Sequence, residues 1–202
     1  MQPFDSVCGT AAPLLAANVD TDVIMPKQFL KGIDRAGLDR GVFFDLRFLP
    51  DGQPDPAFVL NQAPWQWSRF LVVGPNFGCG SSREHAVWGL KQLGIRALIG
   101  SSFAGIFFDN CQRNGVLLIQ LPEEQVQEIG AIVGGAGDAE ICVDLPAQEI
   151  RLRNGQTIGF DIDPLRKESL VLGLDAIGST LQRTAQIRDF EAAHLRANPW
   201  LA

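Results

Sequence analysis

The stretch RFLVVGPNFGCGSSREHAVWGLKQLGIRALIGSSFAGIFFDNCQRNGVLLIQL, residues 69–121, decides the fold class. Short apolar runs of strand length occupy residues 69–74, 96–100 and 116–121, and two segments typical of helices separate them. The segment 82–94 has apolar residues at helical spacing, and 102–115 ends in Asn114-Gly115. This β-α-β-α-β order predicts mainly parallel pairing with right-handed crossovers.

The flanking segments complete the predicted architecture. Residues 49–64 are rich in Pro, Asp and Gly and indicate a surface excursion. Asn154-Gly155 lies between two strand-like segments and predicts a β-hairpin, and Asp163-Pro164 is typical of a helix start. The tail from Leu174 reads as helical and polar. We therefore expect an α/β fold: a single compact domain over residues 1–202, with a mixed, partly parallel sheet flanked by helices.

Composition and charge limit the classes of partner. Hydrophobic residues make up 46% of the 202 residues, which is ordinary for a packed soluble protein. The formal charge of −6 argues against nucleic acid as the main partner, since duplex binding needs a basic surface. The sequence has neither an apolar run of membrane-spanning length nor a basic signal-peptide start. The expected location is therefore the cytoplasm, with no membrane partner.

The cysteines and histidines do not form a recognisable metal motif. The four cysteines are scattered, without a C-x-x-C pair, and are expected to be reduced thiols: Cys8, Cys79, Cys111 and Cys142. His85 and His194 lie far apart in sequence. Because zinc sites usually contain closely spaced Cys or His pairs, we expect no metal bound by this chain alone.

The segment NFGCGSSREHA, residues 76–86, carries the candidate site. It follows a predicted strand and opens a predicted helix, whose free N–H groups and positive dipole end favour an anion. Gly78 and Gly80 allow a sharp turn and close approach of a ligand. Hydroxyls and a guanidinium that suits a carboxylate follow: Ser81, Ser82 and Arg83. The segment therefore predicts a carboxylate or phosphate pocket.

Other interpretations of this segment compete. Dinucleotide binding is disfavoured because Arg83 replaces the third glycine of the G-x-G-x-x-G pattern and no acid follows at the expected distance. A serine-hydrolase elbow requires G-x-S-x-G, which is absent. A Cys79–His85 nucleophile pair has no feature marking the thiol as activated. Ser81 and Glu84 also match a capping box, so Ser81 could simply cap the helix.

The same segment resembles the swivel-domain signature of the aconitase superfamily, in the form found in bacterial isopropylmalate dehydratase small subunits. Further resemblances follow in the family's order along nearly the whole chain: NVDTDVIMPKQFLK at 18–31, SFAGIFFDNCQRNG at 102–115 and GLDAIGSTL at 173–181. The resemblance implies a swivelling β/β/α domain that works with a separate large subunit. That partner would hold a 4Fe-4S cluster, and together they would interconvert 2- and 3-isopropylmalate in leucine biosynthesis.

The resemblance also implies roles for individual residues. Ser81 matches the serine that removes the proton beside a carboxylate, Arg83 matches the carboxylate-binding arginine, and Ser82 supports it. Asp22, in Asp-Thr-Asp, matches an aspartate that supports an acid group of the partner. Judged from the residues alone, this segment is equally well an Asx turn or a helix cap.

Three residues match the family's specificity loop, which contacts the side group of the substrate: Phe29, Leu30 and Lys31. Phe29 and Leu30 are equally compatible with an ordinary core. Paralogous hydro-lyases that act on citramalate, dimethylmalate or homocitrate share this scaffold and remain alternative assignments. A stand-alone anion-binding protein is the alternative outside the enzymes.

Overall fold

The computed structural model describes residues 1–31, 35–135 and 137–201. Its strands are β1 (Ser6–Leu14), β2 (Phe70–Val73), β3 (Ala97–Gly100), β4 (Leu117–Gln120), β5 (Glu140–Asp144), β6 (Glu149–Leu152) and β7 (Thr157–Gly159). Its α-helices are α1 (Thr21–Ile24), α2 (Phe44–Arg47), α3 (Glu84–Gln92), α4 (Gly105–Asn114), α5 (Glu123–Val133), α6 (Pro164–Leu172), α7 (Ala176–Leu181) and α8 (Thr184–Ala197). Short 3-10 helices are η1 (Lys27–Lys31), η2 (Leu38–Gly41), η3 (Val59–Asn61), η4 (Trp65–Trp67) and η5 (Pro199–Leu201).

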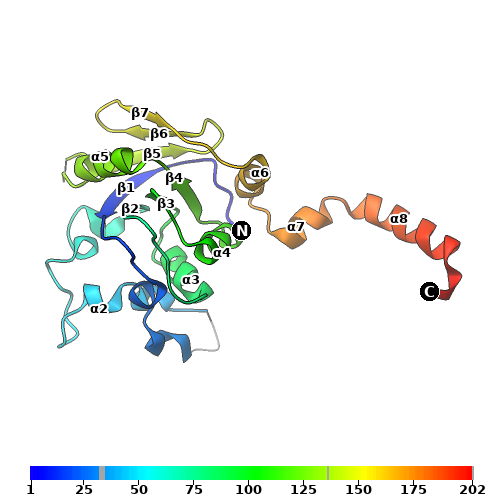
Figure 1. Cartoon of the computed structure of the whole chain (residues 1–202), viewed down its shortest axis with the longest axis horizontal. Coiled ribbons are helices and arrows are strands. Elements are labelled where there is room, and N and C mark those ends of the chain that lie inside the picture. The colour runs from blue at the N-terminus through cyan, green and yellow to red at the C-terminus, as the bar shows by residue number, and fades with distance from the viewer. Residues whose placement is uncertain (32–34, 136, 202) are drawn as a thin grey trace.

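The strands form a mixed sheet in the order β4-β3-β2-β1-β5-β6-β7 (Figure 1). Neighbouring strands from β1 to β4 run parallel, and β5, β6 and β7 add antiparallel pairs beyond β1. The predicted β-α-β-α-β unit is therefore confirmed, with α3 and α4 as its crossovers. We refer to β1–β4 as the parallel half of the sheet and to β5–β7 as the antiparallel half.

Two cores lie on opposite faces of the sheet because successive strand residues point to opposite sides. Leu71 and Val73 of β2 face a core that includes residues of α3 and α4, such as Leu90 and Phe107. Their neighbours Phe70 and Val72 face a second core that α5 completes. Every residue of β2 and β3 is consequently buried, as expected for parallel strands covered on both faces.

The antiparallel half buries one face only. Its buried residues alternate with exposed or half-buried ones along β5 and β6. The predicted hairpin is confirmed at Asn154-Gly155, where Gly155 has φ +91° between β6 and β7. Asp163 caps α6, as the Asp-Pro pair predicts, because its side chain accepts a hydrogen bond from the Arg166 N–H at 3.0 Å.

The expectation that all four cysteines are reduced is wrong for two of them. Cys8 of β1 and Cys142 of β5 are register partners in the antiparallel ladder and form a disulfide, with their Cα atoms 4.0 Å apart. Cys79 and Cys111 are free thiols. The two bonded residues are 134 positions apart in sequence, so only the strand register brings them together.

The chain leaves the compact body after α6. Helices α7 and α8 extend away from the sheet and its covering helices (Figure 1). α8 has no buried residue in the described part of the chain, and Phe190 on it is 70% exposed. The compact body therefore ends with α6, and the helical, polar tail lies outside it. None of the described helices is both long enough and apolar enough to span a membrane.

Candidate functional site

The site lies where β1 and β2 end. The segment after β1 runs beside the 76–83 loop that joins β2 to α3. The Gly78 N–H donates to the Val19 carbonyl at 2.8 Å, and the Thr21 N–H donates to the Cys79 carbonyl at 2.9 Å. Because the ends of adjacent parallel strands meet at one edge of a sheet, residues some 60 positions apart become neighbours here.

Helix α1 places Asp22 against this loop. Asp20 caps the helix, since its carboxylate accepts a hydrogen bond from the Val23 N–H at 2.8 Å. The Thr21 hydroxyl donates to the Ser81 carbonyl at 2.8 Å. The capping interpretation of Asp-Thr-Asp is thus confirmed for its first residue, while Asp22 is left to face the loop.

Arg83 connects two of the predicted site residues. Its guanidinium forms an ion pair with the Asp22 carboxylate, and its Nη2 lies 3.4 Å from the Ser81 hydroxyl oxygen. The Arg83 side chain is only 15% exposed, compared with 40% for Asp22. A cation beside a hydroxyl favours its deprotonated form, so this arrangement is electrostatically suited to a serine that accepts a proton. Ser81 and its neighbour Ser82 are exposed.

The predicted capping box at the start of α3 does not form. The helix begins at Glu84, and Arg83 occupies the N-cap position in an extended conformation without a side-chain cap. Glu84 instead accepts a hydrogen bond from the Asn114 amide at 2.7 Å. The Thr21 hydroxyl holds the Ser81 carbonyl, and Ser81 lies outside the helix. Its hydroxyl therefore does not cap α3 and can interact with a ligand.

The two glycines of the loop have different surroundings. Both have positive φ, +77° at Gly78 and +86° at Gly80. A Cβ on Gly78 would lie 2.2 Å from the Phe107 ring, so packing alone requires glycine there. Gly80 is exposed, with Asp20 as its nearest neighbour. Close approach of a ligand to either glycine stays a prediction.

The residues matched to the specificity loop occupy η1. Phe29 packs over Gly41, and its ring centroid lies 5.0 Å from that of Phe44. Leu30 is half-buried against the core, and Lys31 is exposed. The contacts of Phe29 and Leu30 are therefore those of packing against the core. Residues 32–34, which continue the loop, lie outside the described residues.

The competing thiol interpretation gains no support. The His85 ring packs on Trp88 with centroids 4.7 Å apart, as expected of a structural histidine. Burial raises the pKa of the Cys111 thiol well above its usual value, so that thiol is inert. Across residues 1–31, 35–135 and 137–201, no three His, Cys, Asp or Glu side chains gather in a way that could hold a metal ion.

Two supporting residues, Thr21 and Asn76, are missing from the predictions made from the sequence. Thr21 reads there only as part of a turn, although its hydroxyl fixes the Ser81 carbonyl. Asn76 has φ +57° and donates through its side-chain amide to the Asn18 amide oxygen at 2.8 Å. Its backbone N–H donates to the Ser102 hydroxyl at 2.8 Å. For Asn76 a signal was present, since asparagine is enriched at left-handed positions beside glycine-rich turns.

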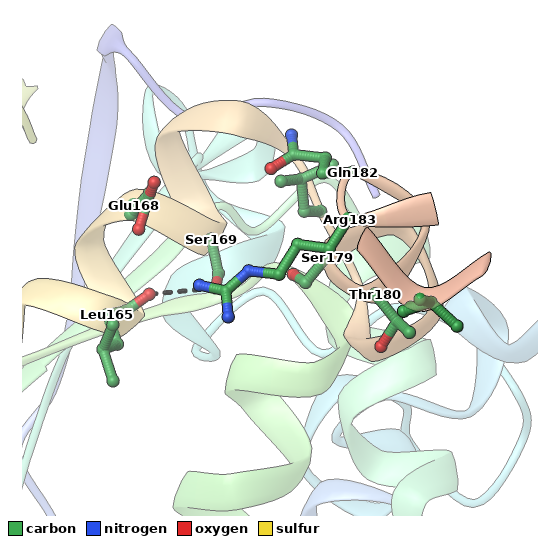
Figure 2. A pocket seen from close by; sticks show the side chains of 9 residues that line it. Leu165, Glu168, Ser169, Ser179, Thr180, Gln182 and Arg183 are labelled. Carbon is green, nitrogen blue, oxygen red and sulfur yellow. Dashed lines mark hydrogen bonds between the residues drawn. The ribbon is translucent and has the colours of Figure 1, made fainter. Parts of the chain in front are cut away.

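A separate hollow of about 500 Å³ lies where the tail leaves the body (Figure 2). Its lining comes from the α6–α8 region and includes Glu168, Ser179 and Arg183. The Ser169 hydroxyl in this lining donates to the Leu165 carbonyl at 2.9 Å. The hollow contains hydroxyls and one charge of each sign, but it is distant in sequence from the loop that carries Ser81.

Comparisons with known proteins show the family of the chain. The aconitase C-terminal domain family matches residues 1–124, and the C-terminal domain of the 3-isopropylmalate dehydratase small subunit matches 177–202; a further match, LeuD_N, covers 133–164. A 3-isopropylmalate dehydratase small subunit of Mannheimia succiniciproducens is 63% identical over 100% of this chain and 99% of the relative. One from Salmonella typhimurium is 56% identical over 100% of this chain and 96% of the relative.

A solved structure gives the same fold. The crystal structure of a 3-isopropylmalate dehydratase (LeuD) from Methanocaldococcus jannaschii superposes with a TM-score of 0.68 at 29% identity. The match covers 92% of this chain and 99% of the other. The chain belongs to the family of 3-isopropylmalate dehydratase small subunits.

Proposed function

We propose that this chain is the small subunit of a 3-isopropylmalate dehydratase, a hydro-lyase that interconverts 2- and 3-isopropylmalate. The carrying observation is the contact of one guanidinium, that of Arg83, with both the Asp22 carboxylate and the Ser81 hydroxyl on an exposed loop. The relatives named for this activity span the chain from end to end. The competing assignment to a stand-alone anion-binding protein leaves that full-length similarity unexplained.

The reaction breaks a C–H bond beside a carboxylate and the C–O bond on the adjacent carbon. In our proposal, Ser81 Oγ takes the proton. A neutral hydroxyl is a weak base, so the adjacent Arg83 guanidinium and the start of α3 would stabilise the negative charge that the oxygen needs. Arg83 also retains N–H donors for the substrate carboxylate, with Ser82 beside it. The hydroxyl group leaves the adjacent carbon as water, protonated by an acid group of the large subunit. On rehydration, water adds its oxygen to the carbon that lost the proton, and Ser81 returns the proton to the other carbon, which gives the isomer.

Asp22 acts in this scheme by holding Arg83. Its carboxylate fixes one edge of the guanidinium and so orients the remaining donors. The family resemblance gives Asp22 a second role, toward an acid group of the large subunit. The structure supports the first role through the ion pair of Asp22 with Arg83. The second role, toward the large subunit, is proposed from the resemblance alone.

The exposure of Ser81 supports the need for a partner. Ser81, Ser82 and Gly80 all face solvent. Electrostatic stabilisation of a charged base is weak in water and becomes strong when water is excluded. A large subunit that covers this loop would exclude the water, so we propose that the active species is a heterodimer. An isolated chain should be inactive.

The iron–sulfur cluster implied by the resemblance does not fit this chain. The described residues contain no grouping of metal ligands, and Cys8 and Cys142 are bonded to each other. We therefore assign the 4Fe-4S cluster to the large subunit. The steps proposed for this chain are proton transfer at Ser81 and carboxylate binding at Arg83.

The substrate assignment rests on the family resemblance of residues 29–31, in which the half-buried apolar side chains of Phe29 and Leu30 would contact the isopropyl group. Lys31 is exposed beside them. None of these three is an arginine that could pair with a third carboxylate, so we expect isopropylmalate to be preferred over homocitrate. A kcat/KM for homocitrate equal to or above that for isopropylmalate would contradict this. Citramalate, which lacks part of the apolar group, should be a slower substrate, since a missing methylene is worth only about 1–3 kcal/mol.

The deciding experiment is anaerobic reconstitution with the large subunit of a close relative, its cluster intact. Wild type should restore isomerase activity, and Ser81→Ala should lower kcat by about 100-fold or more. Its melting temperature should stay unchanged, because Ser81 is no helix cap. Ser6→Ala, at an exposed serine of β1, is the matched control. Near-normal kcat for Ser81→Ala would remove the base assignment, and the absence of any activity with wild type would refute the subunit proposal.

A further inference from the structure

We propose that the Cys8–Cys142 disulfide is a reversible modification site for small thiols that carry both a carboxylate and an amino group. Exchange leaves the small thiol on Cys8 and releases Cys142 as a thiolate. The supporting residues lie where β1 meets the antiparallel half of the sheet (Figure 1). Cys8 is the third residue of β1, whereas the Ser81 loop meets the segment that follows the last. The proposal is therefore independent of the proposed function.

The disulfide is accessible from solvent. Cys8 is exposed and Cys142 is half-buried. The neighbours of Cys142 along β5, Ile141 and Val143, are buried, so the alternation of the strand points the Cys142 side chain to the open face. Both cysteines line a hollow of about 290 Å³, which we call the disulfide hollow. A dissolved thiolate can therefore reach the bond, and exposed disulfides are the ones that exchange most readily.

The arrangement of the strands favours attack on Cys8. In exchange, a thiolate attacks one sulfur from the side opposite the S–S bond, while the other sulfur leaves. The far side of Cys142 is occupied, because Arg151 of β6 is its register partner there. β2 pairs with β1 only from Ala11 to Leu14, so none of the described strands lies beside Cys8 on the side away from Cys142. The incoming thiol therefore bonds to Cys8.

Arg151 stabilises the thiolate that leaves. It lines the disulfide hollow together with Cys142, and its guanidinium is held by Asp144 at 3.4 Å and Glu149 at 3.1 Å. These carboxylates offset part of its positive charge, so the stabilisation should be modest. The step is balanced: one S–S bond forms between the small thiol and Cys8 as the original bond breaks, and the electron pair leaves with Cys142.

The disulfide hollow also has one further charge of each sign, from Arg153 and Glu140. The ion pairs within residues 1–31, 35–135 and 137–201 include neither of them. Glu140 lies two positions before Cys142 on β5 and therefore shares its face. Arg153 can pair with the carboxylate of a small thiol and Glu140 with its ammonium group. Cysteine and glutathione belong to this class of thiol.

The test measures exchange of the full chain with reduced glutathione, by alkylation of the released thiol and peptide mapping. In wild type, glutathione should appear on Cys8 and the alkyl group on Cys142. Arg153→Ala should slow this reaction about threefold, the scale of an exposed ion pair, and should not slow the reaction with uncharged 2-mercaptoethanol. Arg151→Ala should slow both reactions, because it acts on the leaving thiolate. Arg188→Ala, at an exposed arginine of α8, is the matched control and should change neither rate.

A second variant traps the product, since Cys142 can attack the mixed disulfide and restore the original bond. Cys142→Ser removes this thiol. With oxidised glutathione, Cys8 of the variant should gain one glutathione and release the other as a thiol, again about threefold more slowly when Arg153→Ala is added. A wild-type disulfide that stays intact in glutathione, or glutathione found on Cys142 instead of Cys8, would overturn the proposal. Equal rates with and without Arg153 would refute the recognition of the carboxylate. Each outcome is read without the isomerase assay, so failure of the proposed function would leave it unaffected.

Discussion

The two halves of the sheet use the same kinds of residue for different purposes. In the parallel half, β2 and β3 are buried on both faces, and the loops that follow β1 and β2 meet. In the antiparallel half, strands alternate between a buried and an open face. Each half has, on a strand or in the loop after it, an arginine paired with one or more carboxylates and a glycine with positive φ. These are Arg83 and Gly78 after β2, and Arg151 and Gly155 on and after β6. The two arginines differ in how far the surrounding chain covers their side chains.

The comparison shows how environment decides the role of a residue. Arg83 is largely buried between Asp22 and the Ser81 hydroxyl. Arg151 projects from β6 toward Asp144 and Glu149 with a half-exposed side chain. Solvent screens the second group strongly and the first much less. Of these two charge groups, the one at the end of the parallel strands, where we place the candidate site, is therefore the less screened.

The largest expected effect is the loss of activity in Arg83→Ala, with Arg151→Ala as its comparison. Arg83→Ala should lower kcat/KM of the reconstituted enzyme by about 1000-fold, the scale observed when a donor to developing negative charge is removed. Arg151→Ala should leave kcat/KM unchanged and cost at most about 1 kcal/mol of stability, as for exposed ion pairs. Steady-state kinetics and urea unfolding measure both. Equal losses of activity in the two variants would abolish the distinction between the halves.

The glycines should differ in the stability that they contribute. Gly78→Ala would place a Cβ 2.2 Å from the Phe107 ring at φ +77°, so overpacking adds to backbone strain and the cost should be about 3 kcal/mol. Gly155→Ala meets open space at φ +91° and should cost about 1 kcal/mol. Thermal unfolding of the purified variants gives the comparison. A Gly78→Ala protein as stable as wild type would show that Phe107 does not close on this loop.

The smallest expected effect is the loss of stability on removing the disulfide. This bond joins β1 of the parallel half to β5 of the antiparallel half. Cys8→Ser should lower the free energy of unfolding by about 2 kcal/mol in non-reducing buffer, at the low end for cross-links. Wild type treated with dithiothreitol should match the variant, since both lose the same bond. Thiol titration of the denatured protein without reductant should find the two free cysteines, Cys79 and Cys111. Four titratable thiols would show that Cys8 and Cys142 are unpaired and would restore the sequence-based expectation.

Local sequence signals predicted much of this fold. The strands of the parallel half, the Asn154-Gly155 hairpin and the Asp163 cap each depend on residues within a few positions of one another. The structure also brings into contact three residues named from the sequence, Ser81, Arg83 and Asp22, while their roles stay predictions. The strands, the hairpin and the cap needed no knowledge of distant contacts, whereas Asp22 was identified through the family resemblance.

The features that were missed depend on contacts between distant segments. The Cys8–Cys142 bond follows from the register of β1 against β5. The capping box at Ser81 does not form, since α3 begins only at Glu84, whose carboxylate binds Asn114 instead, 30 positions away. The extension of α7 and α8 away from the body could not be predicted either, because helical spacing says nothing about what covers a helix.

The connection between β1 and β2 has a consequence for how such proteins diversify. Residues 15–69 link two adjacent parallel strands through short helices and turns, and they carry Asp22, Phe29 and Leu30. Both ends of this connection are fixed by strand pairing, and within it Ile24, Met25 and Phe43 are buried in the core. The serine loop belongs to the next connection along the chain. In our proposal, Thr21 and Asp22 of this connection serve the proton-transfer loop and Phe29 and Leu30 contact the substrate, so mutations after α1 would alter the range of substrates and leave the proton-transfer chemistry unchanged.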